Sequence, residues 1–209
     1  MDNFSHKQKT SIIYSIKFQT ILKNSMKSDD ELIKAFKDGS DSAFSELLTR
    51  YKTRVYSYVL KMTGNRTASD DLFQEIFLKF AANVNKYRPE QKFSSWIFAV
   101  ARNLVIDYLR KSKRTAMGSI DEGQEDRPLL ETIKSPEKTP EEIALLAEDK
   151  TTIEKAFEKL SEEQREVFLM KHYSKLSFRE ISEIMGLPIG TVLARMSRAT
   201  ARLRKYLPL

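Results

Sequence analysis

Residues 177–206 read SFREISEIMGLPIGTVLARMSRATARLRKY, and this stretch decides the fold of the C-terminal part of the chain. Ser177 opens a capping-box pattern for a short helix that ends near Met185. Gly186-Leu187-Pro188 predicts a turn, and a basic helix follows from about Ile189 to Leu207. A short helix, a tight turn with glycine and a longer basic helix are the signature of a helix-turn-helix. The sequence therefore predicts a DNA-binding module here.

The final helix carries two stripes, since successive residues turn by about 100°. Its apolar stripe consists of Val192, Met196, Ala199, Leu203 and Tyr206. About a quarter-turn away lies a second stripe of Thr191, Arg195, Arg198, Arg202 and Lys205. No acid occurs between Pro188 and Leu209, which is typical of a helix held against the DNA backbone. We expect Thr191 and Arg195 to read bases, and the other three to contact phosphates. A basic helix that contacts protein or RNA is the alternative.

Residues 29–113 also show helical periodicity. Asp41 and Ser42 are expected to cap a helix that ends at Gly64-Asn65, and a second helix is expected to begin at Ser69 or Asp70. Pro89 predicts a break, and Ser94 is expected to cap a third long helix. No strand pattern appears, so the expected fold is all-α, with two small helical domains.

A flexible acidic linker is expected between these domains, over residues 114–148. Its acids outnumber its bases, and Pro128, Pro136 and Pro140 interrupt any helix. The expected boundaries are therefore a basic leader at 1–25, a first domain at 26–113, the linker, and a helix-turn-helix domain at 149–209. We expect the leader to be disordered and dispensable, with Met26 as an alternative start.

Composition argues against an enzyme. The 209 residues include no cysteine and two histidines far apart in the sequence, His6 and His172. No glycine-rich phosphate loop is present. We therefore expect no catalytic residue, no metal, no cofactor and no small-molecule substrate. The net charge of +7 favours an acidic partner, nucleic acid first. No apolar run is long enough for a membrane helix, so a cytoplasmic protein is expected.

Two blocks of sequence, in this order, resemble the sigma-70 family of bacterial transcription initiation factors, and specifically its extracytoplasmic-function (ECF) subfamily. The first block is ASDDLFQEIFLK at 68–79 with FSSWIFAVARN at 93–103 and DYLRK at 107–111. The second is Gly190-Thr191-Val192 followed by Arg195 and Arg198. The resemblance spans roughly Asp29 to Leu207, interrupted by the linker. It implies a sigma factor that directs polymerase to promoters and opens the duplex.

The resemblance also implies roles for individual residues. Core RNA polymerase would be bound, at the clamp helices of its largest subunit, by Asp70, Asp71, Gln74, Glu75 and Lys79. The loop from Tyr87 to Phe93 would capture a flipped-out base of the −10 element, which makes the −10 set Arg88, Lys92, Phe93, Arg102, Asn103, Arg110 and Lys111. The −35 element would be bound by Ser177, Arg179, Thr191, Arg195, Arg198, Arg202 and Lys205. Trp96 is interpreted as a core residue.

The implied partners are core RNA polymerase, including its flap region, and promoter DNA, and the family allows for an anti-sigma factor. One departure concerns Leu193 and Ala194, since the family often has a basic or polar residue after Gly-Thr-Val. The −35 preferences of the family are therefore not transferred. The main alternative is a helix-turn-helix regulator that does not replace sigma. A helical adaptor that uses its basic helix on RNA or lipid is a second alternative.

Overall fold

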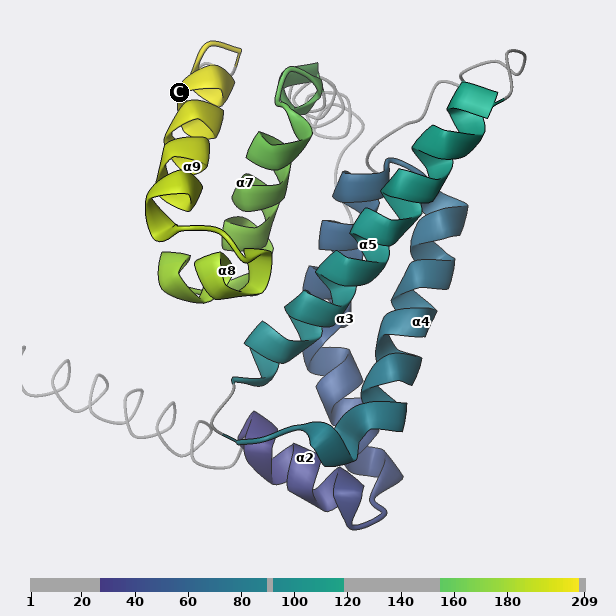
Figure 1. Cartoon of the computed structure of the whole chain (residues 1–209). Coiled ribbons are helices and arrows are strands. Elements are labelled where there is room, and N and C mark those ends of the chain that lie inside the picture. The colour runs from purple at the N-terminus through teal and green to yellow at the C-terminus, as the bar shows by residue number, and fades with distance from the viewer. Residues whose placement is uncertain (1–26, 90–91, 119–154, 207–209) are drawn as a thin grey trace, which may run out of the picture. The chain divides into compact units, whose positions relative to one another are not determined.

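The computed structural model describes residues 27–89, 92–118 and 155–206, and every regular element in these ranges is helical. The leader and most of the expected linker lie outside the described residues. The chain divides into two compact units, Met1–Leu47 and Leu48–Leu209, and the helix α3 (Asp41–Thr63) runs through the boundary between them. Figure 1 labels the helices. The expected all-α class is confirmed for the described residues.

The first unit contains α2 (Asp29–Lys37) and the start of α3. Ser28 caps α2 through a capping box with Glu31, whose backbone N–H donates to the Ser28 hydroxyl oxygen at 3.2 Å. Gly39, with a φ of 95°, lies in the turn that follows, a conformation that favours glycine. Across this turn the rings of Phe36 and Phe44 lie 5.1 Å apart. Local capping and this ring contact thus connect α2 to α3.

The helix α4 (Arg66–Asn83) begins earlier than the sequence predicts. Asn65 is its cap, and the Asn65 side chain accepts from the Ala68 backbone N–H at 3.0 Å. Ser69, the predicted start, is buried in the helix and donates to the Asn65 carbonyl oxygen at 2.6 Å. The prediction was wrong because asparagine caps as well as serine does, and the Ser69 hydroxyl serves a local packing contact instead.

The short 3-10 helix η1 (Val84–Lys86) leads to the loop before α5 (Phe93–Gly118), which begins one residue before the predicted cap, Ser94. In the second unit α4 and α5 lie side by side (Figure 1). The Phe93 ring lies within 6.4 Å of four other rings and packs edge-on to Tyr51 at 4.9 Å. Phe93 is therefore the centre of an aromatic cluster that fixes the loop to the start of α5. The other three rings belong to Phe80, Tyr87 and Trp96. α5 continues past Lys113, into the residues expected to form the linker.

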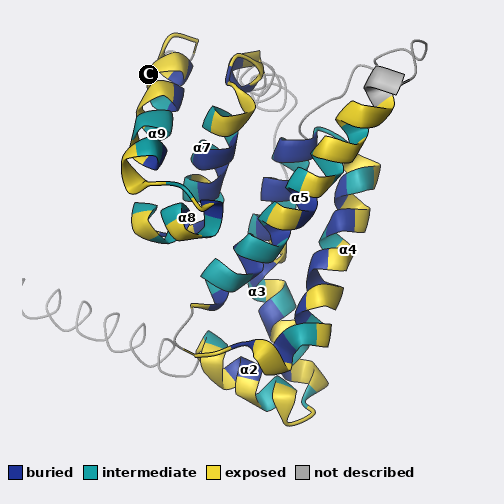
Figure 2. Ribbon diagram, in the orientation of Figure 1, coloured by how far each residue is buried: buried dark blue, intermediate teal, exposed yellow. Residues whose placement is uncertain are grey.

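The C-terminal helices are α7 (Glu162–Ser174), α8 (Phe178–Met185) and α9 (Ile189–Arg204), and they pack on one another. Gly186 ends α8 with a φ of 63°, the left-handed conformation that a helix end followed by a tight turn requires. Figure 2 shows buried residues on the inner faces of these helices and exposed residues on the outer faces. On α9 the buried residues are Val192, Ala199 and Leu203, all from the predicted apolar stripe. The predicted helix-turn-helix is confirmed.

Candidate nucleic-acid interface

The outer face of α9 is basic and open to solvent. Arg198, Arg202 and Lys205 are exposed. Within the described part of the chain, no ion pair to a carboxylate involves these three residues. Because the opposite face of α9 is buried, its cations project away from the core of the C-terminal helices. This basic face is able to meet the phosphates of a DNA duplex.

Thr191 and Arg195, the predicted base readers, are half-buried. The positive charge of Arg195 is close enough to α7 to lower the pKa of the Glu163 carboxyl, a shift caused mainly by the Ser161 hydroxyl. Arg195 therefore lies on the side of α9 that faces α7. Base reading by Arg195 stays a prediction. In this conformation Arg195 would reach a base from the side of α9 that faces α7.

Two large apolar residues near the start of α9 are exposed instead. Ile189 has 46% and Leu193 has 45% of its surface accessible, although the neighbouring Val192 is fully buried. Gly190 lies between them, and a Cβ added there would meet nothing within 4 Å. The start of α9 thus presents an uncharged and partly apolar surface next to the basic face. Ala194 adds a further small uncharged residue.

A second basic surface runs along α5, and three of its cations are paired with carboxylates of the C-terminal helices. Lys92 Nζ lies 2.9 Å from Glu180 Oε1 on α8. Lys113 Nζ lies 2.7 Å from the Glu162 carboxylate at the start of α7. We call Arg102 and Lys113 of α5, together with Lys92 directly before this helix, the α5 cations. Each of them meets a carboxylate from α7 or α8.

The third α5 cation makes the most buried of these pairs. Arg102 Nε donates to Glu166 Oε1 at 2.6 Å, and the two side chains are 20% and 7% exposed. Burial raises the pKa of the Glu166 carboxyl, while the Arg102 guanidinium opposes the rise. The buried hydroxyl of Tyr58 lies in the field of the same carboxylate and makes no hydrogen bond within the described residues. The Glu166 charge at this junction therefore depends on Arg102 for its stabilisation.

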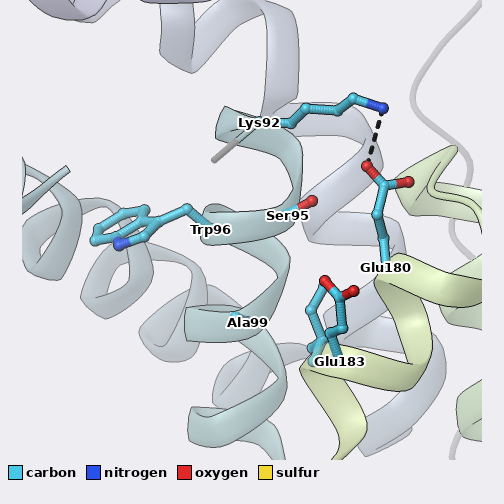
Figure 3. Close-up of a pocket in the computed structure, with 7 residues that line it drawn as sticks. Lys92, Ser95, Trp96, Ala99, Glu180 and Glu183 are labelled. Atoms are coloured by element: carbon cyan, nitrogen blue, oxygen red, sulfur yellow. Dashed lines mark ion pairs between the residues drawn. The ribbon is translucent and has the colours of Figure 1, made fainter. Parts of the chain in front are cut away.

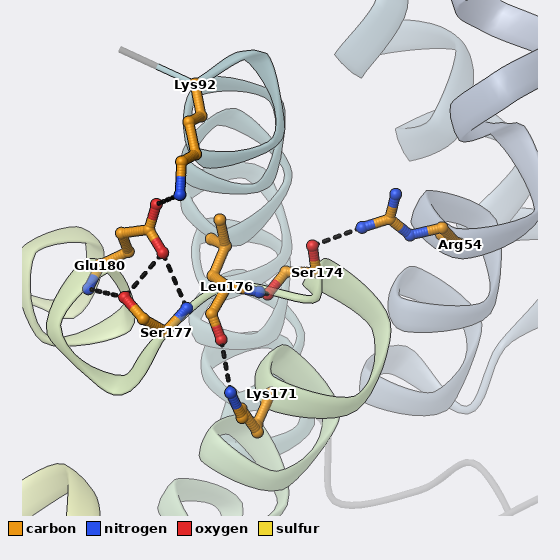
Figure 4. Close-up of polar contacts among 7 residues, drawn as sticks. All are labelled: Arg54, Lys92, Lys171, Ser174, Leu176, Ser177 and Glu180. Carbon is orange, nitrogen blue, oxygen red and sulfur yellow. Dashed lines mark hydrogen bonds and ion pairs between the residues drawn. The ribbon is translucent and has the colours of Figure 1, made fainter. Parts of the chain in front are cut away.

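Arg54 on α3 adds a contact to the end of α7. Its Nε donates to the Tyr173 carbonyl oxygen at 2.7 Å, and its Nη2 donates to that of Ser174 (Figure 4). These carbonyls belong to the last turn of a helix, where no intrahelical donor is left for them. Lys175 follows in the left-handed conformation, and Lys171 Nζ donates to the Leu176 carbonyl oxygen at 2.7 Å. A cation of α3 thus completes the C-terminal cap of α7.

A pocket of about 340 Å³ separates part of α5 from α8. Figure 3 shows Lys92 reaching across it to Glu180, with Glu183 on the same side as Glu180 and the Trp96 ring turned away. The helices are joined here by long polar side chains and not by a close-packed apolar seam. The pocket is lined by Lys92, Ser95, Trp96, Ala99, Glu180, Glu183 and Ile184.

The remaining members of the predicted −10 set differ in exposure. Arg88, Asn103 and Lys111 are exposed, and Arg110 makes a loose surface pair with Asp107 at 3.8 Å. Phe93 is 1% exposed, so in this conformation its ring is covered by the surrounding protein and is not open to a DNA base. Trp96, interpreted as a core residue, is only half-buried.

The predicted polymerase-binding residues form one exposed face of α4. All five are exposed: Asp70, Asp71, Gln74, Glu75 and Lys79. The Tyr56 hydroxyl donates to Asp70 Oδ1 at 2.7 Å and so fixes that carboxylate. Glu75 and Lys79 form a surface pair at 3.1 Å, which contributes little stability but keeps both charges on this face. Leu78 lies among them with 68% of its surface accessible.

Among the predicted −35 residues of α8, Ser177 has a local role. Its hydroxyl donates to Glu180 Oε2 at 2.6 Å, and the Glu180 backbone N–H donates back to it at 3.2 Å. This bond, together with Lys92, lowers the pKa of the Glu180 carboxyl to about 2. Arg179 is exposed beside this cap.

Sequence reasoning missed two kinds of residue. Leu78 and Leu193 lie off the apolar stripes of their helices, and this periodicity could have identified both as exposed. The carboxylates of Glu162, Glu166 and Glu180 gave no such signal. Glu166 is separated from Arg102 by 64 positions, and a pair at that distance depends on tertiary structure.

Among the described residues, no cluster of three or more acids and histidines is placed to hold a metal ion. No described helix combines the length and the apolar character needed to cross a membrane.

Two family models match the chain. Sigma-70 region 2 matches residues 47–115, and sigma-70 region 4 matches residues 150–203. The chain is 33% identical over 176 residues to the ECF RNA polymerase sigma factor SigW of Bacillus subtilis (strain 168), covering 84% of this chain and 94% of that protein. The chain belongs to the ECF sigma factors. It is also 28% identical over 177 residues to the ECF RNA polymerase sigma-E factor of Escherichia coli (strain K12), covering 82% of this chain and 90% of the relative.

A solved structure agrees with this fold. It is the co-crystal structure of the sigma factor RpoE with the anti-sigma factor NepR from Bartonella quintana. The match has a TM-score of 0.62 and 24% identity, and it covers 79% of this chain and 97% of that one. In this ECF sigma factor, α3 to α5 therefore lie in region 2, and α7 to α9 lie in region 4. None of these comparisons matches a catalytic family.

Proposed function

We propose that this ECF sigma factor binds core RNA polymerase through the exposed face of α4. Asp70, Asp71 and Glu75 supply negative charge, Gln74 and Lys79 add hydrogen-bonding groups, and Leu78 adds apolar contact. The clamp helices of the largest polymerase subunit are the partner at this face, and the flap region is the partner of region 4. What supports this is the exposure of the whole set on one helix within the matched region 2.

The −10 element meets the loop before α5 and the basic surface of α5. The cations for the DNA backbone come from Arg88, Lys92, Arg102, Arg110 and Lys111. Asn103 lies on α5 among them. The aromatic cluster around Phe93 supports the loop that receives an unstacked base. Opening the duplex draws on binding energy alone, so the factor itself catalyses no reaction, and the polymerase makes the RNA.

The −35 element meets α8 and α9. The start of α9 enters the major groove, while Arg198, Arg202 and Lys205 hold the flanking phosphates. Ser177 and Arg179 lie at the start of α8, where a helix N-terminus attracts a phosphate. The single observation that carries the proposal is the distribution of charge. Acidic residues lie on α4 in region 2, and α9 in region 4 has a basic face without a carboxylate partner among the described residues.

The proposed domains are residues 26–113 for region 2 and 149–209 for region 4, and α5 extends the first of them to Gly118. The acidic linker joins them along the polymerase. The factor acts in the cytoplasm, beside polymerase. An anti-sigma factor is a further proposed partner, since the Bartonella RpoE was solved with one.

Transcription with purified components tests the proposal. The full chain is added to a bacterial core RNA polymerase and a library of promoters, and promoter-specific transcripts are sequenced. We expect transcripts that depend on the added factor and share −10 and −35 elements. Asp71→Lys is expected to lower the affinity for core polymerase by roughly tenfold through like-charge repulsion. A chain that binds promoter DNA but never yields a factor-dependent transcript would be a regulator that does not replace sigma.

A further inference from the structure

The start of α9 leaves two large apolar side chains, Ile189 and Leu193, nearly half exposed. Leu193 is nearly half exposed, although the next residue towards the core, Val192, is fully buried. Its neighbours three and four residues away on the helix surface are Ile189, which is also 46% exposed, the half-buried Met196, Gly190 and Ser197. Leu193 and Ile189 are therefore the two large apolar side chains that are exposed on this part of the helix.

The position of Leu193 is the one at which a recognition helix meets base edges. It lies about one turn into α9, and the N-terminal residues of a recognition helix contact bases in the major groove. The cations on the helix begin further along, so the charged contacts to phosphates flank this patch. Gly190 leaves open space where a Cβ would stand, which allows a close approach of the helix to its partner.

We propose that Leu193 reads the C5-methyl group of a thymine in the −35 element. Thymine is the base that presents a methyl group in the major groove, beside its O4 acceptor, and apolar side chains contact this methyl group. A leucine has no hydrogen-bonding group, so it discriminates between bases by covering a methyl group and by excluding polar edges. This inference rests on the proposed function, and it names the base that the helix recognises.

Deoxyuridine isolates the contact, because it differs from thymidine only by the methyl group. The −35 element is first selected from a randomised library with the wild-type holoenzyme. Each thymine in it is then replaced by deoxyuracil, and holoenzyme binding is measured. At one thymine we expect the wild-type affinity to fall about fourfold, the value for one buried methylene-sized group. Leu193→Ala should bind more weakly overall and should no longer distinguish the two bases there.

Tyr206→Ala is the matched control, since Tyr206 is also 45% exposed and lies just beyond the end of α9. This variant should keep the full sensitivity to the methyl group. The inference is overturned if no thymine methyl affects wild-type binding, or if the methyl effect persists in Leu193→Ala. These results are distinct from a failure of the proposed function, in which the wild-type holoenzyme would select no −35 sequence at all.

A different observation, the pairing of the α5 cations, carries a second inference. Lys92 and Arg102 belong to the proposed −10 surface, and both are bound by carboxylates of region 4. Lys113 at the end of the same helix is bound in the same way. A carboxylate and a DNA phosphate offer the same charge and the same acceptor oxygens to a cation.

We infer that the α5 cations bind either region 4 or the −10 DNA backbone, but not both. The interface is suited to separation, because a pocket and long polar side chains lie between α5 and α8. In the Lys92–Glu180 and Lys113–Glu162 pairs at least one of the two side chains is well exposed, so these pairs contribute little to stability. The Arg102–Glu166 pair is the strong one, and Arg54 adds its contact to α7.

The test changes only the carboxylates of region 4, which lie outside the proposed DNA contacts. The triple variant Glu162→Gln, Glu166→Gln, Glu180→Gln is compared with Asp38→Asn, Asp41→Asn, Glu158→Gln. The control removes the same charge from exposed acids for which no pair with α5 is found in the described chain. The probe is a labelled single strand carrying the selected −10 element, and the protein is the full chain without polymerase. The interface variant should bind roughly tenfold more tightly than the control variant.

Fluorescence energy transfer measures the separation directly. The chain has no cysteine, so single cysteines at the exposed positions Lys86 and Lys159 accept dyes selectively. Energy transfer should be high in the free wild type and lower in the interface variant, and −10 DNA should lower it in the wild type. Equal DNA affinity in both triple variants, or energy transfer unchanged by saturating DNA, would overturn the inference. Thermal unfolding of each variant establishes that its helices are intact.

Discussion

The molecule has two basic helical surfaces, and they differ in what their cations touch. On α9, Arg198, Arg202 and Lys205 are exposed, with no carboxylate partner in the described chain. The α5 cations, which are Arg102 and Lys113 on the helix and Lys92 directly before it, are each within 3 Å of a glutamate. Sequence alone gives both helices the same cationic character. The difference arises from tertiary contacts. Positive charge in the sequence therefore indicates a nucleic-acid surface, but it does not show whether that surface is open to bind DNA in the folded protein.

Reversing charge on α9 should have the largest effect, because this surface is open. In Arg198→Glu with Arg202→Glu, two phosphate contacts become repulsive, and we expect promoter-dependent transcription to fall on the order of a hundredfold. Holoenzyme binding to a promoter duplex across a salt series should also show a shallower salt dependence. Lys155→Glu with Lys159→Glu is the charge-matched control, from exposed residues before α7. If both double variants lose the same activity, the loss reflects net charge alone and not the position of the cations on α9.

Breaking the buried pair on α5 should have the next largest effect. Arg102→Ala leaves the Glu166 carboxylate without its partner, and removing one member of a buried pair costs about 3–5 kcal/mol where the other stays buried. Because α7 is able to move away, the measured loss in the free energy of unfolding should lie below that range. Adding Glu166→Met should restore stability, since it removes the unpaired charge. Denaturant unfolding measures both, and an unchanged midpoint in Arg102→Ala would show that the pair is not formed in solution.

The third prediction concerns the pH dependence of the Lys92–Glu180 contact. The pKa of Glu180 lies at about 2, below its ordinary value of 4.5, mainly because the Ser177 hydroxyl donates to its carboxylate. Folding therefore favours the ionised form. The resulting stabilisation is complete above pH 4.5 and is lost as the pH falls towards 2. The stability difference between wild type and Glu180→Gln should shrink across this window. A difference that stays constant from pH 6 to pH 2 would contradict this cause.

The smallest expected effect separates a cap from a DNA contact. Ser177→Ala removes the cap of α8 and should cost about 1 kcal/mol of stability. Ser161→Ala removes the corresponding capping box of α7, away from the proposed −35 surface, and serves as the control. If the two variants lose equal stability but Ser177→Ala also loses promoter affinity, Ser177 contacts DNA in addition to capping its helix. Equal promoter affinity would limit Ser177 to the cap.

The sequence predicted the features that depend on local pattern. The helix-turn-helix follows from two capping signals, Gly186 and the stripes of α9, and all of these are properties of neighbouring residues. The start of α4 was wrong because Asn65 and Ser69 are both suitable caps, and only packing decides between them. The exposed face of α4 was also found, since it lies opposite an apolar stripe.

The contacts of the α5 cations could not be predicted in the same way. Arg102 and Glu166 are on different helices, and nothing in the residues around Glu166 distinguishes it from a solvated glutamate of a capping helix. The half-burial of Arg195 and the full burial of Phe93 are likewise consequences of which helices pack together. Such features need the three-dimensional structure because they pair residues that are far apart in the chain.

Trp96 is the only tryptophan in the chain, and it lines the pocket between α5 and α8. Its indole stacks near Phe93, is half-buried and turns away from the carboxylates of α8, so the ring itself belongs to the aromatic cluster of region 2. An indole that becomes more hydrated emits at longer wavelength. The unlabelled protein thus carries its own optical signal for changes in the aromatic cluster at the start of α5, one that a stopped-flow instrument could follow in real time as polymerase is added.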